Sequence, residues 1–166
     1  TELPKKEIAK LCLKASKRAG SQAAFRSSAK YADSGIKRLG ENPWDVDYGL
    51  TLELYNISAE AYWSNGDTKT CQRRAKSVQK HAKCLEDRFR AFHVVLGAHK
   101  TDRNWAKCCD ECLRGLDAVG VKVPAVVGKL DIVRILFRVK RLIRGRTPEQ
   151  LVETLPRLEN KALAEA

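Results

Sequence analysis

The chain has 166 residues, of which 43% are hydrophobic, so it can form the buried core of one domain and is not a wholly disordered polypeptide. No apolar run approaches the length of about 18 residues that a membrane-spanning helix needs, and we expect no membrane insertion. The formal net charge of +12 admits nucleic acid or an acidic surface as a partner, but it also fits Lys and Arg side chains that only solvate helices.

Two features of the composition suggest a segment of a longer intracellular protein. The chain contains no methionine, so Thr1 is not a translation start, and we expect a fragment of a longer solenoid. Most of the six cysteines fall inside helical patterns, where cysteine acts as a small apolar residue, and not in a loop-rich disulfide framework. We therefore expect a reducing, cytoplasmic setting.

Helical periodicity begins near the N-terminus. It predicts a helix over 5–19 and a second helix over about 21–39, with glycines at their ends. Asn42 and Pro43 predict a helix start, and the helix that follows is expected to run to about Ser64. One stripe of that helix carries Leu52, Tyr55, Ala59 and Tyr62.

Later apolar stripes share one spacing of four, three, four and three residues. The stripe that begins at Cys71 follows the helix break at Gly66-Asp67, and the stripe that begins at Trp105 repeats it at an offset of 34 residues. A helical period of about 34 residues is typical of tetratricopeptide-type repeats. We therefore predict an all-α fold, a right-handed stack of antiparallel helix pairs with about seven or eight helices. It forms a single domain over 1–166, with units at about 22–64, 67–101 and 103–145.

The C-terminal part combines apolar and basic residues. After Pro124, a helix of about twenty residues to Gly145 carries apolar stripes on two sides, which predicts burial on two sides. Thr147 to Gln150 predicts a further helix start with a capping box, and that helix is expected to run through Leu155. The remaining edge of the long helix is either a solvated edge or a contact for phosphates or an acidic partner; it consists of Arg134, Arg138, Arg141 and Arg144.

With these segments placed, the chain resembles the helical repeat region of large multidomain signalling proteins in which an AAA-like or STAND-type predicted ATPase domain precedes the repeats. The resemblance covers about Ala15 to Leu155 and is carried by Ala29–Gly40, Leu52–Asp67 and Arg144–Leu151. Proteins of that family often begin with a serine/threonine kinase domain and end with sensor histidine-kinase or cyclase modules. The resemblance implies a TPR-like α-solenoid in signal transduction, with ATP binding and protein kinase activity elsewhere in the parent protein.

No catalytic motif is complete in this segment. Gly128-Lys129 is similar to the end of a phosphate-binding P-loop, but Val123 and Leu130 stand where the loop requires Gly and Ser or Thr. No HExxH motif or isolated carboxylate pair stands out either. We expect no enzyme activity and no cofactor here.

A zinc site is the one metal centre that the sequence suggests. Cys108, Cys109 and Cys112, with His99 or Cys84, supply enough ligands in number. Two of these cysteines lie on the apolar stripe, however, and no second CxxC or HxxxH motif completes a four-ligand set. We therefore favour no metal, and interpret His99 as a core or boundary residue.

The expected function is regulatory. We expect a scaffold whose concave side binds a protein or peptide partner, or neighbouring domains of the same chain, and so alters the contact with the ATPase. The alternative is a basic helical-repeat module that binds nucleic acid, which the net charge of +12 motivates. The candidate partner-binding residues are Tyr55, Tyr62, Phe89, Arg134, Arg138, Arg141 and Arg144.

Overall fold

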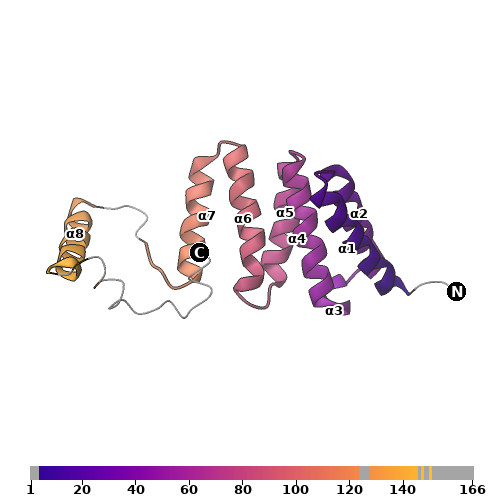
Figure 1. The fold of residues 1–166 in the computed structure, drawn as a ribbon, viewed down its shortest axis with the longest axis horizontal. Helices are drawn as coiled ribbons and strands as arrows, with labels where there is room; N and C mark the ends of the chain where they lie inside the picture. The colour runs from indigo at the N-terminus through magenta and orange to yellow at the C-terminus, as the bar shows by residue number, and fades with distance from the viewer. Residues whose placement is uncertain (1–3, 124–127, 146, 148–149, 151–166) are drawn as a thin grey trace. The chain divides into compact units, whose positions relative to one another are not determined.

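The computed structural model describes residues 4–123, 128–145, 147 and 150, and this part of the chain is all-helical, without a strand. The chain divides into two compact units, Thr1–Gly115 and Leu116–Ala166, each of which is described by itself. No helix of the described residues is both long and apolar enough to cross a bilayer. The helices (Figure 1) are α1 (Lys5–Ser21), α2 (Phe25–Leu39), α3 (Pro43–Val46), α4 (Tyr48–Ser64), α5 (Thr68–His81), α6 (Glu86–Thr101), α7 (Trp105–Ala118) and α8 (Lys129–Ile143).

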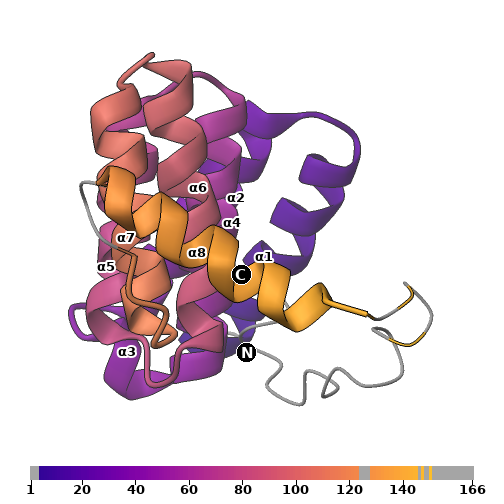
Figure 2. The same ribbon diagram turned by 90° about the vertical axis from the view of Figure 1, so that its left-hand side faces the viewer.

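The first unit is a stack of antiparallel helices. α4 packs mainly against α2 and α5, and it also contacts α1, α3 and α6. Figure 2, which looks along the stack, shows α5 and α7 on one side and α4 and α6 on the other. This packing is that of a helical-repeat superhelix, as the periodicity predicts. Because α2 packs on both α1 and α4, and α5 on both α4 and α6, helix pairs can be counted from α1 or from α2. The units at 22–64, 67–101 and 103–145 stay a prediction.

The core of the first unit consists of two buried clusters, and α4 contributes to both. One joins α4 to α1 and α2, and the other joins it to α5 and α6. In the first cluster, Leu54 is fully buried beside Gly35. In the second, the predicted stripe of α5 is confirmed for Cys71, Ala75 and Val78, which have no exposed surface, whereas α5 ends at His81, before the last two predicted members, Ala82 and Leu85.

The stripe that repeats this one in α7 is not buried in the same way. Trp105 is 58% exposed, and Cys109 and Cys112 are also exposed. The side of α7 that meets α6 is a different one, where Gly115 lies against the ring of Phe92. Equal spacing along two helices therefore does not give equal burial, because α5 has a helix on either side of it within the first unit.

The helix predicted from Pro43 to Ser64 is wrong in one respect, because it is two helices. Asn42 makes no side-chain capping bond, and the chain turns extended at Asp47, with φ −158° and ψ 99°. The Asp47 carboxylate instead accepts a bond of 3.0 Å from the Leu50 amide and caps α4. An ion pair of 2.9 Å with Lys6 and this amide bond together lower the pKa of Asp47.

The connection between α5 and α6 contains neither Gly nor Pro, and a tertiary contact fixes it. The hydroxyl of Tyr48 accepts a bond of 2.9 Å from the Lys83 amide and donates one to the Asp87 carboxylate. Burial of the phenol, followed by the bond to Asp87, raises the pKa of Tyr48. A side chain from α4 thus replaces the local turn signal that the sequence lacks.

The second unit departs from the expectation of a doubly buried helix. α8 begins at Lys129, the apolar side chains that the structure describes on it lie exposed, and Leu130 and Phe137 are 84% and 73% exposed. An apolar stripe is buried only where another element packs on it, and the pattern of one helix does not supply that element. The capping box is confirmed by bonds of 3.1 and 3.4 Å between Thr147 and Gln150, whereas residues 124–127 and the segment through Leu155 lie outside the described residues.

We predict that Gly35→Ala destabilises the protein by about 1–3 kcal/mol, the usual cost of overpacking a closed core. An added Cβ would lie 2.8 Å from Leu54 Cδ2 and 3.1 Å from Cys12 Cβ, and Leu54 is too buried to move away. Urea unfolding followed by circular dichroism measures the change.

Gly49→Ala is the matched control, since its Cβ meets only Asp47 Oδ1 at 3.9 Å near the exposed start of α4. Alanine favours a helix over glycine by about 1 kcal/mol, so the control should be neutral or stabilising. Equal stability of Gly35→Ala and the native chain would contradict the close approach of α2 and α4.

Candidate functional site

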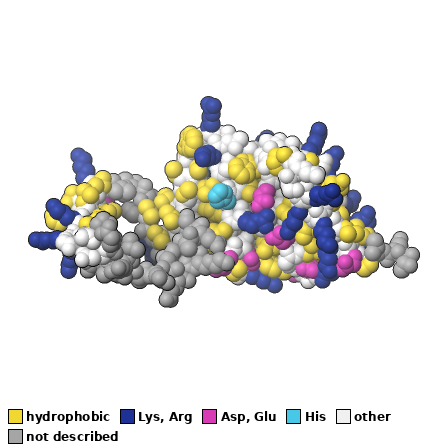
Figure 3. All heavy atoms as spheres, viewed as in Figure 1, with side chains coloured by type: hydrophobic (Ala, Val, Ile, Leu, Met, Phe, Trp, Pro, Cys, Tyr) yellow, Lys and Arg dark blue, Asp and Glu magenta, His cyan; other side chains and the backbone are white. Residues whose placement is uncertain are grey.

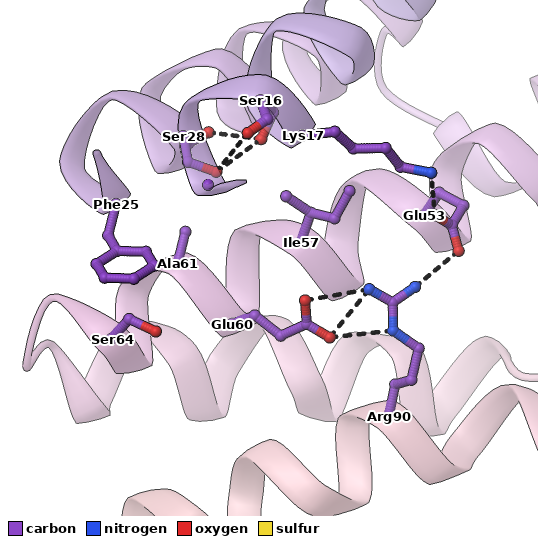
Figure 4. Close-up of a pocket in the computed structure, with 11 residues that line it drawn as sticks. Ser16, Lys17, Phe25, Ser28, Glu53, Ile57, Glu60, Ala61, Ser64 and Arg90 are labelled. Carbon is purple, nitrogen blue, oxygen red and sulfur yellow. Dashed lines mark hydrogen bonds and ion pairs between the residues drawn. The ribbon is translucent and has the colours of Figure 1, made fainter. Parts of the chain in front are cut away.

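The first unit contains a groove of about 400 Å³ that is lined by residues of α1, α2, α4 and α6. Figure 4 shows Phe25, Ala61 and Ser64 at one end of this groove and charged side chains at the other. Because the two ends differ in polarity, a peptide bound along the groove would contact apolar side chains at one end and charged side chains at the other. The remaining lining residues are Ser16, Lys17, Gly20, Ser28, Glu53, Ile57, Glu60 and Arg90.

The charged end is a chain of ion pairs from three helices. Arg90 of α6 donates to both oxygens of Glu60, at 3.0 and 3.1 Å, and to Glu53 at 2.8 Å. Lys17 of α1 lies 2.9 Å from the other oxygen of Glu53. Ion pairs as exposed as these contribute roughly 0–1 kcal/mol each, so a ligand can exchange them at low cost. Figure 3 shows such mixed acidic and basic side chains on the face of the first unit in view.

The wall between α1 and α2 is held by two serines. Ser16 Oγ donates 2.8 Å to the carbonyl of Ser28, and Ser28 Oγ donates 2.9 Å to the carbonyl of Ser16. Both side chains are buried, and they leave no hydroxyl without a partner. Small hydroxyls with reciprocal bonds allow the two helices to approach closely, which fixes this wall of the groove.

The sequence-predicted contacts Tyr55 and Tyr62 lie outside the groove lining. The hydroxyl of Tyr62 donates 2.6 Å to Asp33 Oδ2, and Arg74 and Ser58 bind Asp33 Oδ1 at 2.8 and 2.9 Å. The Arg74 guanidinium also lies 5.3 Å from the centre of the Tyr55 ring. These groups join α2, α4 and α5, so both tyrosines stabilise the stack.

The other predicted contacts lie on separate elements. Phe89 is half-buried on α6 and is not among the residues that line the groove. The three arginines of α8 and Arg144 directly after it are exposed and line a surface hollow with Phe137 and Ile143. In the second unit the predicted arginines therefore lie together on one surface; they are Arg134, Arg138, Arg141 and Arg144.

The cysteines are free thiols in different surroundings. Burial, together with the charge of Asp67, raises the pKa of Cys71 to about 11, so this thiol is a poor nucleophile at neutral pH. Cys112 has its pKa raised by burial and by the neighbouring Cys108 thiol. Within the part of the chain that the structure describes, no three His, Cys, Asp or Glu side chains are grouped to hold a metal ion, and His99 lies buried in α6.

Comparison of the chain with protein-family models, curated proteins and solved structures gives no match.

Sequence reasoning missed the groove, although one signal for it was present. Glu53 and Glu60 are two helical turns apart on α4, which is otherwise largely apolar, and carboxylates at that spacing share one face. Their partners come from α1 and α6, at positions that no periodicity links to them. These four charged side chains come together only because α1 and α6 both pack against α4; they are Lys17, Glu53, Glu60 and Arg90.

We predict that Asp33→Asn lowers the pKa of Tyr62 toward the ordinary value for tyrosine. The hydrogen bond to the Asp33 carboxylate is the largest cause of the raised pKa, and burial is the next. The difference in tyrosinate absorbance between each protein and its Tyr62→Phe variant reports this titration.

The sign of the linked stability change follows from the raised pKa. The neutral phenol of Tyr62 stabilises the fold below about pH 10, the pKa of an unfolded tyrosine, and this contribution is lost as the pH rises through the folded pKa. The native chain should therefore lose stability more steeply than Asp33→Asn above pH 10. The titration of Tyr48 is the internal control and should not change; an unchanged Tyr62 titration would contradict the assignment.

Proposed function

We propose that the chain is a non-catalytic helical-repeat scaffold that mediates protein–protein or interdomain contacts, and that the groove formed by α1, α2, α4 and α6 receives the partner as a peptide segment. The supporting observation is the groove itself, with an apolar end at Phe25 and Ala61 and a charged end at Arg90. Each wall comes from a different helix of the stack, so binding would also fix the angles between the helices.

The size and polarity of the groove fit a short peptide better than a metabolite. A volume of about 400 Å³ is that of a small ligand site, but the site is open and its charges are paired with one another. Buried, unpaired polar groups are what fix a small molecule in place, whereas exchangeable surface pairs suit a partner with charges of both signs.

The resemblance to repeat regions of multidomain signalling proteins supplies the proposed context. In that context the scaffold connects a predicted ATPase domain, and a kinase domain in the parent protein, to sensor or cyclase modules. We propose a cytoplasmic location, which the six free thiols support because disulfides are rare in reducing compartments.

The groove assignment predicts that Ser64→Trp lowers peptide affinity about tenfold or more, equivalent to about 1.4 kcal/mol. Ser64 is exposed at the apolar end of the groove, where an indole would occupy the space of the ligand without displacing the core. Twelve-residue peptides selected from a phage library on the whole chain serve as probes, and calorimetry measures their affinities.

Ser34→Trp is the matched control, because Ser34 is an equally exposed helical serine on α2 outside the groove. Its affinities should stay within about twofold of the native chain, near the limit of a measurable difference in free energy. A library that yields no binder, or binders that tolerate Ser64→Trp as well as Ser34→Trp, would refute the groove as the partner site.

A further inference from the structure

The outer edges of α2 and α5 carry two rows of cations that the groove does not use. The row on α2 consists of Arg26, Lys30 and Lys37, and the row on α5 consists of Lys69, Arg73, Lys76 and Lys80. At about 100° per residue, each row falls within about 60° of the helix circumference, opposite the buried stripe of its own helix. We call these two rows the outer basic rows.

All seven side chains of the outer basic rows are exposed, and within the described residues none of them forms an ion pair. Arg73 donates only to the hydroxyl of Thr70, at 2.9 Å. The inner face is different, because there Lys17 and Arg90 are matched by carboxylates. The outer basic rows therefore carry seven cations that no ion pair neutralises within the described residues.

The two rows lie on neighbouring helices. Arg74 of α5 reaches Asp33 of α2 with an ion pair of 2.8 Å, so the helices flank the same surface of α4. The α5 row runs from Lys69 to Lys80, a length of about 16 Å at a rise of about 1.5 Å per residue. A ligand on this surface meets two lines of positive charge and not a single cluster.

We propose that the outer basic rows bind the phosphate backbone of double-stranded DNA, independently of sequence. Lys and Arg without carboxylate partners neutralise phosphates and release their counterions, which is enough for non-specific binding. Two separate lines of cations allow contacts to the phosphates of both strands. The inference is independent of the peptide groove, which lies on other side chains.

The residues between the cations favour DNA over the other polyanions. The large apolar side chains that are exposed in the first unit lie outside both rows; they are Leu11, Tyr31, Val46 and Trp105. A protein interface needs aromatic or aliphatic anchors, an amphipathic membrane helix needs an apolar face beside its cations, and single strands are bound largely by stacking on aromatic rings. The outer basic rows supply none of these.

The test measures binding of a fluorescent, mixed-sequence 24-bp DNA duplex to the whole chain by anisotropy between 50 and 300 mM NaCl. We expect micromolar binding with a slope of log K against log[salt] of about −6 if all seven cations contact phosphates, at about −0.9 per contact. Replacing Lys69, Arg73, Lys76 and Lys80 together by Gln should weaken binding at least tenfold and reduce the slope by about 3 to 4.

The matched control replaces by Gln four arginines that are also exposed, which removes the same charge; they are Arg134, Arg138 and Arg141 of α8 and Arg144 directly after it. This control should change the slope of log K against log[salt] by less than about 0.9, the value for one phosphate contact. Equal losses in the two variants would show that net charge alone drives binding and would overturn the proposal, as would the absence of saturable binding at 50 mM NaCl. Competition by polyglutamate, single-stranded RNA or phosphatidylserine vesicles as effective as by duplex DNA would overturn it too.

Folding and the peptide site are checked on the same variants. The circular dichroism spectrum and the thermal melting of the fourfold α5 variant should match those of the native chain, since the four replaced side chains are exposed. If the fourfold variant unfolds, the single variant Arg73→Gln tests the same contact, and its slope of log K against log[salt] should be smaller by about one. Groove-binding peptides should bind the α5 variant normally, so failure of either proposal is visible without the other.

Discussion

The packing of the first unit depends on the burial of α4 by the helices around it. Its sequence is apolar on most sides, and α1, α2, α5 and α6 all pack against it. Leu54 is buried against Gly35 of α2, while Ala59 belongs to the cluster with α5 and α6. No single helix pair could bury so many sides of one helix, and the stack is the arrangement that does so.

Stacking around α4 also decides where the charges lie. The helices that meet on the groove side bring cations and carboxylates within bonding distance of one another, as at Arg90 and Glu53. The exposed edges of α2 and α5 have no helix in front of them, and their cations stay unpaired among the described residues. One stack thus offers a groove in which charges of both signs are paired and helix edges on which exposed cations are unpaired, and these suit different classes of partner.

Some helix boundaries are set by local capping residues and others by tertiary contacts. Asp67 caps α5 by accepting a bond of 2.9 Å from the Thr70 amide, as the Gly66-Asp67 pair predicts. The end of α5 carries no such signal, and the Tyr48 hydroxyl holds the connection from α4. Before α4 the sequence offers two possible helix starts. The Asp47 carboxylate caps α4, whereas Asn42, the predicted cap, makes no side-chain capping bond.

By itself the sequence determines the helical class, the approximate bounds of most helices and the buried stripe of α5, since each follows from spacing along one helix. Only the tertiary structure decides which stripes are covered, so Cys71 is buried whereas Cys109 and the apolar residues of α8 are exposed. It alone assigns Tyr55 and Tyr62 to the packing of α2, α4 and α5, and it alone assembles the groove. The physical reason is that spacing along a helix states which residues share a face, whereas burial and ion pairing depend on the element that meets that face.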